Sequence, residues 1–198
     1  LAGVPLSHKL GKELRLTDLV EGAKKGFRHV PSDEAYWRDA AWTLDLFSTL
    51  LSPGAQSFRN GAGETVDFGL VMDDALAYLE RAQEDIARGM DAGLPQVDKR
   101  KQGIYAHTCG GLHLFQAVAG WARHPKVRKK WAGRLDRQVD VLFYRLGSEA
   151  RQYEAALAQA PEYRLYILVQ MLKFYGHFLE TTGRMKLDGM LKLSARRT

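Results

Sequence analysis

The stretch PEYRLYILVQMLKFYGHFLE, residues 161–180, carries apolar side chains on nearly every face that an α-helix would present. Pro161 suits the first turn of a helix, and Gly183 suits the position just after its end. A helix that is apolar all round is typical of a protein interior. We therefore expect this stretch to form a helix in the centre of the fold.

The rest of the chain shows helical rather than strand-like periodicity. In the segment 33–51 the apolar residues recur at three- and four-residue spacing, as Trp37, Ala40, Ala41, Leu44, Phe47 and Leu51. We also expect helices at about 17–29, 67–90, 125–146 and 149–158, and in the apolar segment 104–121. The sequence predicts an all-α fold over residues 1–198, a single-domain irregular bundle of about six or seven helices with a central apolar helix.

Capping and helix-breaking residues give the expected boundaries. Thr17 can cap the first helix, and Pro31-Ser32-Asp33 separates it from the second. The segment Asn60-Gly61-Ala62-Gly63 has the composition of a turn. Gly147-Ser148 marks a break or kink, and we expect the tail at 195–198 to fray.

Composition excludes several classes of protein. The chain has 198 residues, of which 45% are hydrophobic and 26% are charged, as in ordinary globular proteins. Its single cysteine, Cys109, excludes an internal disulfide framework and a cysteine-only metal cluster. No run of 18 apolar residues is present, so we expect a soluble protein without a membrane-spanning helix. Because the chain begins at Leu1 rather than at Met, we expect that a leading segment has been removed, either by a signal peptidase, as in an exported protein, or by the choice of the expressed segment.

Charge is divided unevenly along the chain. Residues 1–97 hold 10 Lys and Arg against 15 Asp and Glu, whereas residues 98–198 hold 19 against 8. The net charge is therefore −5 for the first part and +11 for the second. A basic surface could attract an anionic partner, but we favour the simpler interpretation that the basic part docks against the acidic part.

The segment 107–113 is the densest in chemistry-bearing side chains, with the sequence His107-Thr108-Cys109-Gly110-Gly111-Leu112-His113. Cys109 and His113 are four residues apart and would share one face of a helix. Two adjacent glycines disfavour a helix interior, so we expect the helix to begin near Gly110 and His107 to lie on the incoming loop.

A transition metal is the first chemistry that this segment predicts. Thiolate and imidazole are good ligands for zinc, copper and iron. The predicted metal ligands are His107, Cys109, His113 and His177. Glu180 and Asp73 are alternatives for the fourth position. A non-covalent haem with an axial ligand from this segment is a second alternative, because the covalent attachment motif is missing.

Two other interpretations remain open for the segment. A thiol at a helix amino terminus has a lowered pKa, so Cys109 could be a nucleophile with His107 or His113 as its base. Alternatively, the cysteine is a small core residue, the histidines satisfy backbone groups and the glycines permit close packing. Whether the protein is an enzyme stays open. We favour a helical binding protein with a metal or small-ligand site that lies against the helix 163–178.

A basic stretch covers residues 123–137, and its predicted anion-binding residues are Lys126, Arg128, Lys129 and Lys130. Such a cluster could neutralise nucleic-acid phosphates or lie on an anionic membrane. Cations at a helix start oppose the dipole, and no recognition helix stands out, so nucleic acid is not favoured. A scaffold role with another anionic partner remains an alternative. The signatures G-x-G-x-x-G, G-x-x-x-x-G-K-[ST], H-E-x-x-H and G-x-S-x-G are missing, which disfavours the common nucleotide, zinc-protease and serine-hydrolase functions.

Overall fold

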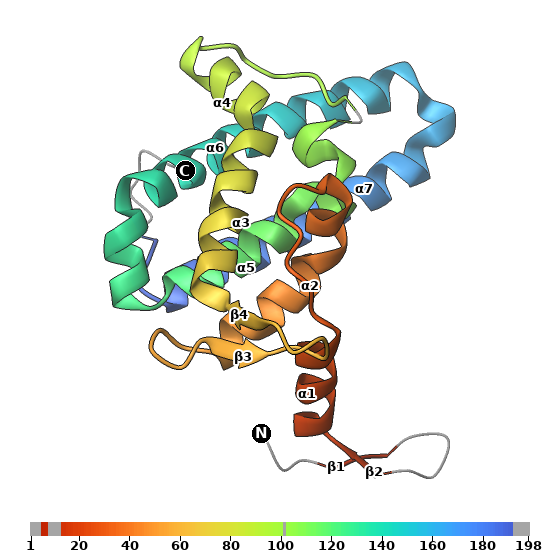
Figure 1. The fold of residues 1–198 in the computed structure, drawn as a ribbon. Helices are drawn as coiled ribbons and strands as arrows, with labels where there is room; N and C mark the ends of the chain where they lie inside the picture. Colours follow the sequence, from red (N-terminus) through yellow and green to blue (C-terminus); the bar gives the residue numbers. More distant parts are fainter. Residues whose placement is uncertain (1–4, 8–12, 101, 192–198) are drawn as a thin grey trace.

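The computed structural model describes residues 5–7, 13–100 and 102–191, and its architecture is all-α (Figure 1). The α-helices of these residues are α1 (Leu16–Gly26), α2 (Glu34–Leu50), α3 (Phe68–Ala82), α4 (Glu84–Asp91), α5 (Leu112–Ala122), α6 (Pro125–Gln159) and α7 (Arg164–Leu187). The short 3-10 helices are η1 (Gly103–Ala106), η2 (Thr108–Gly111) and η3 (Pro161–Tyr163). The two antiparallel hairpins are formed by β1 (Pro5–Ser7) with β2 (Glu13–Arg15), and by β3 (Ser57–Arg59) with β4 (Thr65–Asp67). The prediction of an all-α fold with about seven helices is confirmed.

Helix α2 forms as its sequence predicts. The carboxylate of Asp33 caps it by accepting a hydrogen bond from the backbone N–H of Ala35 at 2.8 Å. The predicted apolar stripe is buried from Trp37 to Phe47. This stripe packs mainly against α5, because the two helices lie side by side.

Helix α5 occupies the centre of the fold. Ten of its 11 residues are buried, and α2, α3, α6 and α7 all pack against it (Figure 1). Gly120 permits close packing of α2 on α5, because a Cβ there would meet the Oγ of Ser48 at 2.6 Å. The segment 104–121 therefore supplies the central helix.

Helix α7 is peripheral, so its predicted central position is wrong. Ile167, Phe174 and Phe178 are buried, but the opposite face exposes large apolar side chains. Leu165, Leu172 and Leu179 are 77%, 73% and 67% exposed. Hydropathy on all faces did not imply burial here because α5, not α7, fills the space between the other helices.

The predicted helix 67–90 is divided into α3 and α4 at Gln83. The Gln83 side chain is buried and donates a hydrogen bond to the Oε1 atom of Gln138 at 2.7 Å. This contact with α6 holds the bend, which the apolar spacing alone could not predict. The Asn60–Gly63 segment is a turn as predicted, but it joins β3 to β4, two strands that the sequence pattern did not reveal.

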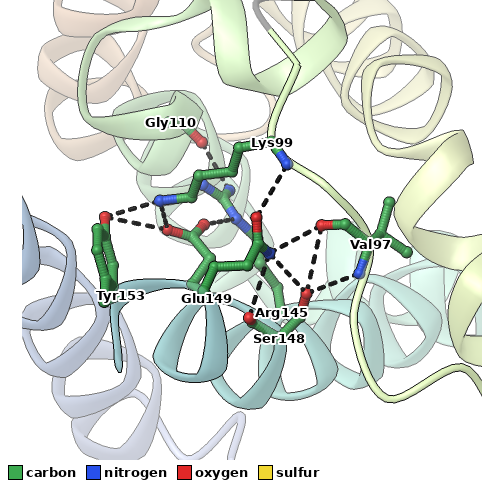
Figure 2. Close-up of polar contacts among 8 residues, drawn as sticks. Val97, Lys99, Gly110, Arg145, Ser148, Glu149 and Tyr153 are labelled. Carbon is green, nitrogen blue, oxygen red and sulfur yellow. Dashed lines mark hydrogen bonds and ion pairs between the residues drawn. The ribbon is translucent and has the colours of Figure 1, made fainter. Parts of the chain in front are cut away.

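The predicted break at Gly147-Ser148 is also wrong, because α6 continues through it. Ser148 is fully buried, and its hydroxyl accepts a hydrogen bond from the backbone N–H of Val97 at 3.0 Å (Figure 2). One glycine costs a helix only about 1 kcal/mol, which this lateral anchoring offsets. At the first helix, Thr17 lies inside the first turn, since α1 already begins at Leu16. Helix α7 likewise runs past Gly183, and the tail at 195–198 lies outside the described residues.

The basic part of the chain docks against the acidic part through side-chain ion pairs. These pairs are Lys130–Asp73, Arg134–Glu80, Arg137–Asp91 and Arg184–Asp45. Most of their members are exposed, and such pairs typically contribute less than about 1 kcal/mol each, so they orient α6 and α7 more than they stabilise them. Among the described helices, none is both long enough and apolar enough to cross a lipid bilayer.

Candidate metal centre

The turn that precedes α5 has an unusual backbone. Cys109, Gly110 and Gly111 have φ angles of 51°, 60° and 73°, so three consecutive residues lie in the left-handed region. Cys109 is the only non-glycine residue with positive φ among the residues that the structure describes. A left-handed conformation costs a residue with a Cβ about 1–2 kcal/mol. Such strain persists only where the surroundings enforce it, and it is commonest at functional sites.

Packing around the two glycines enforces this turn. The carbonyl oxygen of Gly110 accepts a hydrogen bond from the Nη1 atom of the buried Arg145 at 2.6 Å. A Cβ at Gly110 would overlap the Arg145 guanidinium, and a Cβ at Gly111 would overlap the Ile104 side chain. The turn thus requires glycine at both positions.

Three of the four predicted metal ligands converge. One ligand atom each from Cys109, His113 and His177 lies within 4.8 Å of the other two. Cys109 and His113 come from the two sides of the η2–α5 junction, whereas His177 comes from the middle of α7. His113 is buried, and the other two are partly exposed. We call these three residues the Cys–His–His triad.

Hydrogen bonds orient both imidazoles of the triad. The Nδ1 atom of His113 lies 3.2 Å from the Oε1 atom of Gln116, and the Nδ1 atom of His177 lies 3.2 Å from the Oε2 atom of Glu180. Gln116 in turn donates to the same Glu180 oxygen at 3.0 Å. Each Nδ1 faces an oxygen acceptor, which favours the tautomer with a proton on Nδ1 and the lone pair on Nε2. Histidines that bind metals are commonly held by such partners.

Burial and nearby groups shift the pKa values of His113, Cys109 and Glu180. Burial lowers the pKa of His113, and neighbouring His177 lowers it further, which favours the neutral ring. Burial also raises the pKa of the Cys109 thiol, against the opposing effect of Lys173. Although burial alone would raise the pKa of Glu180, hydrogen bonds from Gln116 and His177 bring it below its usual value.

The indole of Trp42 packs against His113 of the triad. Its ring centroid lies 3.7 Å from that of His113, at an interplanar angle of 34°. The His113 and His177 rings meet edge to face, with their centroids 4.3 Å apart. Neither Trp42 nor Gln116 belongs to the predicted site, although Gln116 follows His113 by three residues and therefore shares its helix face.

His107 lies apart from the triad. Its Nε2 atom is 2.8 Å from the hydroxyl of Tyr78 on α3, and the side chain is buried. Burial, reinforced by the positive charge of Arg38, lowers the pKa of His107 to about 4. His107 has an extended backbone and immediately precedes η2. Asp73 is also engaged elsewhere, because it accepts hydrogen bonds from Lys130 and from the indole of Trp131.

The four predicted anion-binding residues have different environments. The Arg128 guanidinium donates to the backbone carbonyls of Arg123 and Gly189, at 3.0 and 3.2 Å. Lys130 pairs with Asp73 at 2.6 Å. Lys126 and Lys129 are exposed. Half of the predicted group is therefore committed to contacts within the fold.

Comparison with known proteins adds no family. The chain has no significant match among protein families, curated proteins or solved structures.

Proposed function

We propose that the protein binds a transition metal ion through the Cys–His–His triad. The observation that carries this proposal is the convergence of one sulfur and two imidazole donors to within 4.8 Å of one another, from η2, α5 and α7. Around zinc such donors would stand roughly 3.5 Å apart. A contraction of roughly 1 Å would therefore complete the arrangement, which side-chain rotation can supply.

The donor set determines the class of metal. Thiolate and imidazole together select zinc, copper or iron over magnesium or calcium, which prefer oxygen ligands. Three protein ligands leave a fourth position for water or for a small ligand, as in catalytic rather than structural zinc sites. The hydrogen bonds to Gln116 and Glu180 support this assignment, because they leave the Nε2 atoms of the two rings available to the metal.

A thiol nucleophile is supported less well by the same residues. Burial raises the pKa of Cys109, whereas a nucleophilic cysteine needs a lowered one. His107, one of the two predicted bases, is bonded to Tyr78 instead. His113 is the remaining base, and its Nδ1 atom is already engaged by Gln116.

The test is metal analysis of the full chain, purified without an affinity tag and compared with four variants. Wild-type protein is expected to hold close to one equivalent of zinc, copper or iron after reconstitution. Cys109→Ser, His113→Gln and His177→Gln should each lose most of it. Substitution with cobalt(II) should give the absorption of a cobalt–thiolate bond, and Cys109→Ser should abolish that absorption.

The matched control is His107→Gln. It removes a buried histidine from the same segment, but one that lies outside the triad. This variant should keep the metal of the wild type. Absence of metal from the wild type, or equal loss in His107→Gln and His113→Gln, would refute the proposal.

A further inference from the structure

A pocket of about 410 Å³ lies beside the triad, between α6, α7 and residues that include Lys99, Tyr105 and Gly110. Figure 2 shows the polar side chains that line its α6 side, with Lys99 reaching over Glu149 toward Tyr153. We call it the cationic pocket. Its size falls in the range of small-molecule sites.

The described lining of the pocket is rich in positive charge. It contains Lys99, Arg100, Arg145 and Lys173, against one carboxylate, that of Glu149. Arg145 and Glu149 are each 1% exposed, so these charges are fixed within the fold. Lys173 and Arg100 are exposed and lie toward solvent. An excess of one charge sign around a pocket favours a ligand of the opposite sign.

Glu149 is shared between two cations and cannot neutralise the pocket. Its Oε1 atom accepts from the Nε atom of Arg145 at 2.5 Å, while its Oε2 atom pairs with the Lys99 ammonium. Burial lowers the pKa of Lys99, and Glu149 offsets this only in part, while Arg145 adds to it. The pocket is thus short of negative charge, even with Glu149 ionised.

Aromatic rings form the rest of the wall. Tyr105 and Phe174 lie on the Arg145 guanidinium, at 4.9 and 5.2 Å from their ring centroids. Lys99 lies 4.0 Å from the centre of the Tyr153 ring. Such rings bind the flat or apolar part of a ligand while the cations bind its charged end. Tyr166 adds a further, largely exposed ring.

From these observations we infer that the cationic pocket binds a small organic anion, whose phosphate or carboxylate group meets Lys99 and Lys173 and whose ring or apolar part lies on the aromatic wall. Cys109 lines the same pocket, so the ligand would sit next to the sulfur of the triad. The inference does not require a metal, since the lining described above contains its own charges.

The experiment is calorimetric titration of the full chain with phenyl phosphate, benzoate, inorganic phosphate and uncharged benzyl alcohol. Phenyl phosphate or benzoate should bind more tightly than inorganic phosphate, and benzyl alcohol should bind least. The first two probes also distinguish a phosphate from a carboxylate ligand. Lys173→Glu should weaken binding by about 10-fold, because it reverses a charge at the pocket without removing a contact of the fold.

Lys186→Glu is the matched control, because it makes the same charge change at an exposed position of α7 outside the pocket. It should leave the affinity within about 2-fold, as long-range effects are screened by salt. The titrations are repeated on protein depleted of metal with a chelator. Binding that persists there supports the inference whatever the fate of the metal proposal.

Three outcomes would overturn the inference. They are failure of all three anions to bind at millimolar concentration, equal weakening by Lys173→Glu and Lys186→Glu, and complete loss of anion binding on metal depletion. The last result would place the anion on the metal rather than in the pocket, and it would leave the metal proposal intact.

Discussion

Helices α5 and α7 are both rich in apolar residues, yet they occupy opposite environments. Helix α5 is buried on nearly all sides, whereas α7 buries one face and exposes leucines on the other. The two helices pack directly against each other, and the Cys–His–His triad spans their contact. The apolar content of a helix sets how well it can be buried, but the surrounding helices decide which one is buried.

The largest expected difference between the two helices is in core stability. Phe115→Ala in α5 should lower the free energy of unfolding by about 3–5 kcal/mol, because Phe115 is 2% exposed and its loss leaves a cavity. Leu172→Ala in α7 should change it by less than about 0.5 kcal/mol, since that side chain is 73% exposed. Urea unfolding followed by circular dichroism measures both. Comparable losses in the two variants would mean that the outer face of α7 is covered in solution.

Metal binding should raise the free energy of unfolding of the whole chain, because it would link the two helices. A metal held by the triad joins α7 to the start of α5, and it binds the folded chain only. At a free zinc concentration 100 times its dissociation constant, the expected stabilisation is about 2.7 kcal/mol. Thermal unfolding with and without zinc measures the effect, and Cys109→Ser should abolish it. A zinc-induced shift of equal size in that variant would point to binding elsewhere on the chain.

Glycine substitutions should give opposite signs in the two regions. Gly110→Ala should destabilise the fold by about 2 kcal/mol, because φ is +60° there and the new Cβ would displace Arg145. Gly176→Ala in α7 should stabilise it by about 0.5–1 kcal/mol, since that position is helical and a Cβ there meets nothing within 4 Å. Chemical denaturation of the pair provides the measurement. If Gly110→Ala were neutral, the left-handed turn would not be enforced by its surroundings.

Local patterns predicted much of the fold. The Asp33 cap, the stripe of α2 and the helix beginning after Gly110-Gly111 were all predictable, because each depends on residues close together in the chain. The bend at Gln83, the continuity of α6 at Gly147 and the outer position of α7 depend on distant partners. No periodicity within one helix encodes such contacts.

The candidate site divides in the same way. Spacing along one helix predicted that Cys109 and His113 would lie together. They do, although Cys109 lies in the left-handed turn before α5 and not on the helix itself. The sequence predicted His107 as a metal ligand, but its ring is hydrogen-bonded to Tyr78 and lies outside the triad. Tyr78 is 29 residues away in the chain, so spacing within the segment 107–113 could not predict this contact. The cationic pocket was not predicted. Lys99 and Arg145 both pair with Glu149, and they come together only because the segment that carries Lys99 packs on α6.

Trp42 gives the site an optical signal of its own. It is the one tryptophan of the four that is largely exposed, at 59%, while Trp37, Trp121 and Trp131 are buried. Because its indole rests on the imidazole of His113, we expect protonation or metal binding at that ring to change the fluorescence of this indole. Long-wavelength emission therefore reports on the site, and short-wavelength emission reports on the core, within a single spectrum of the unlabelled chain.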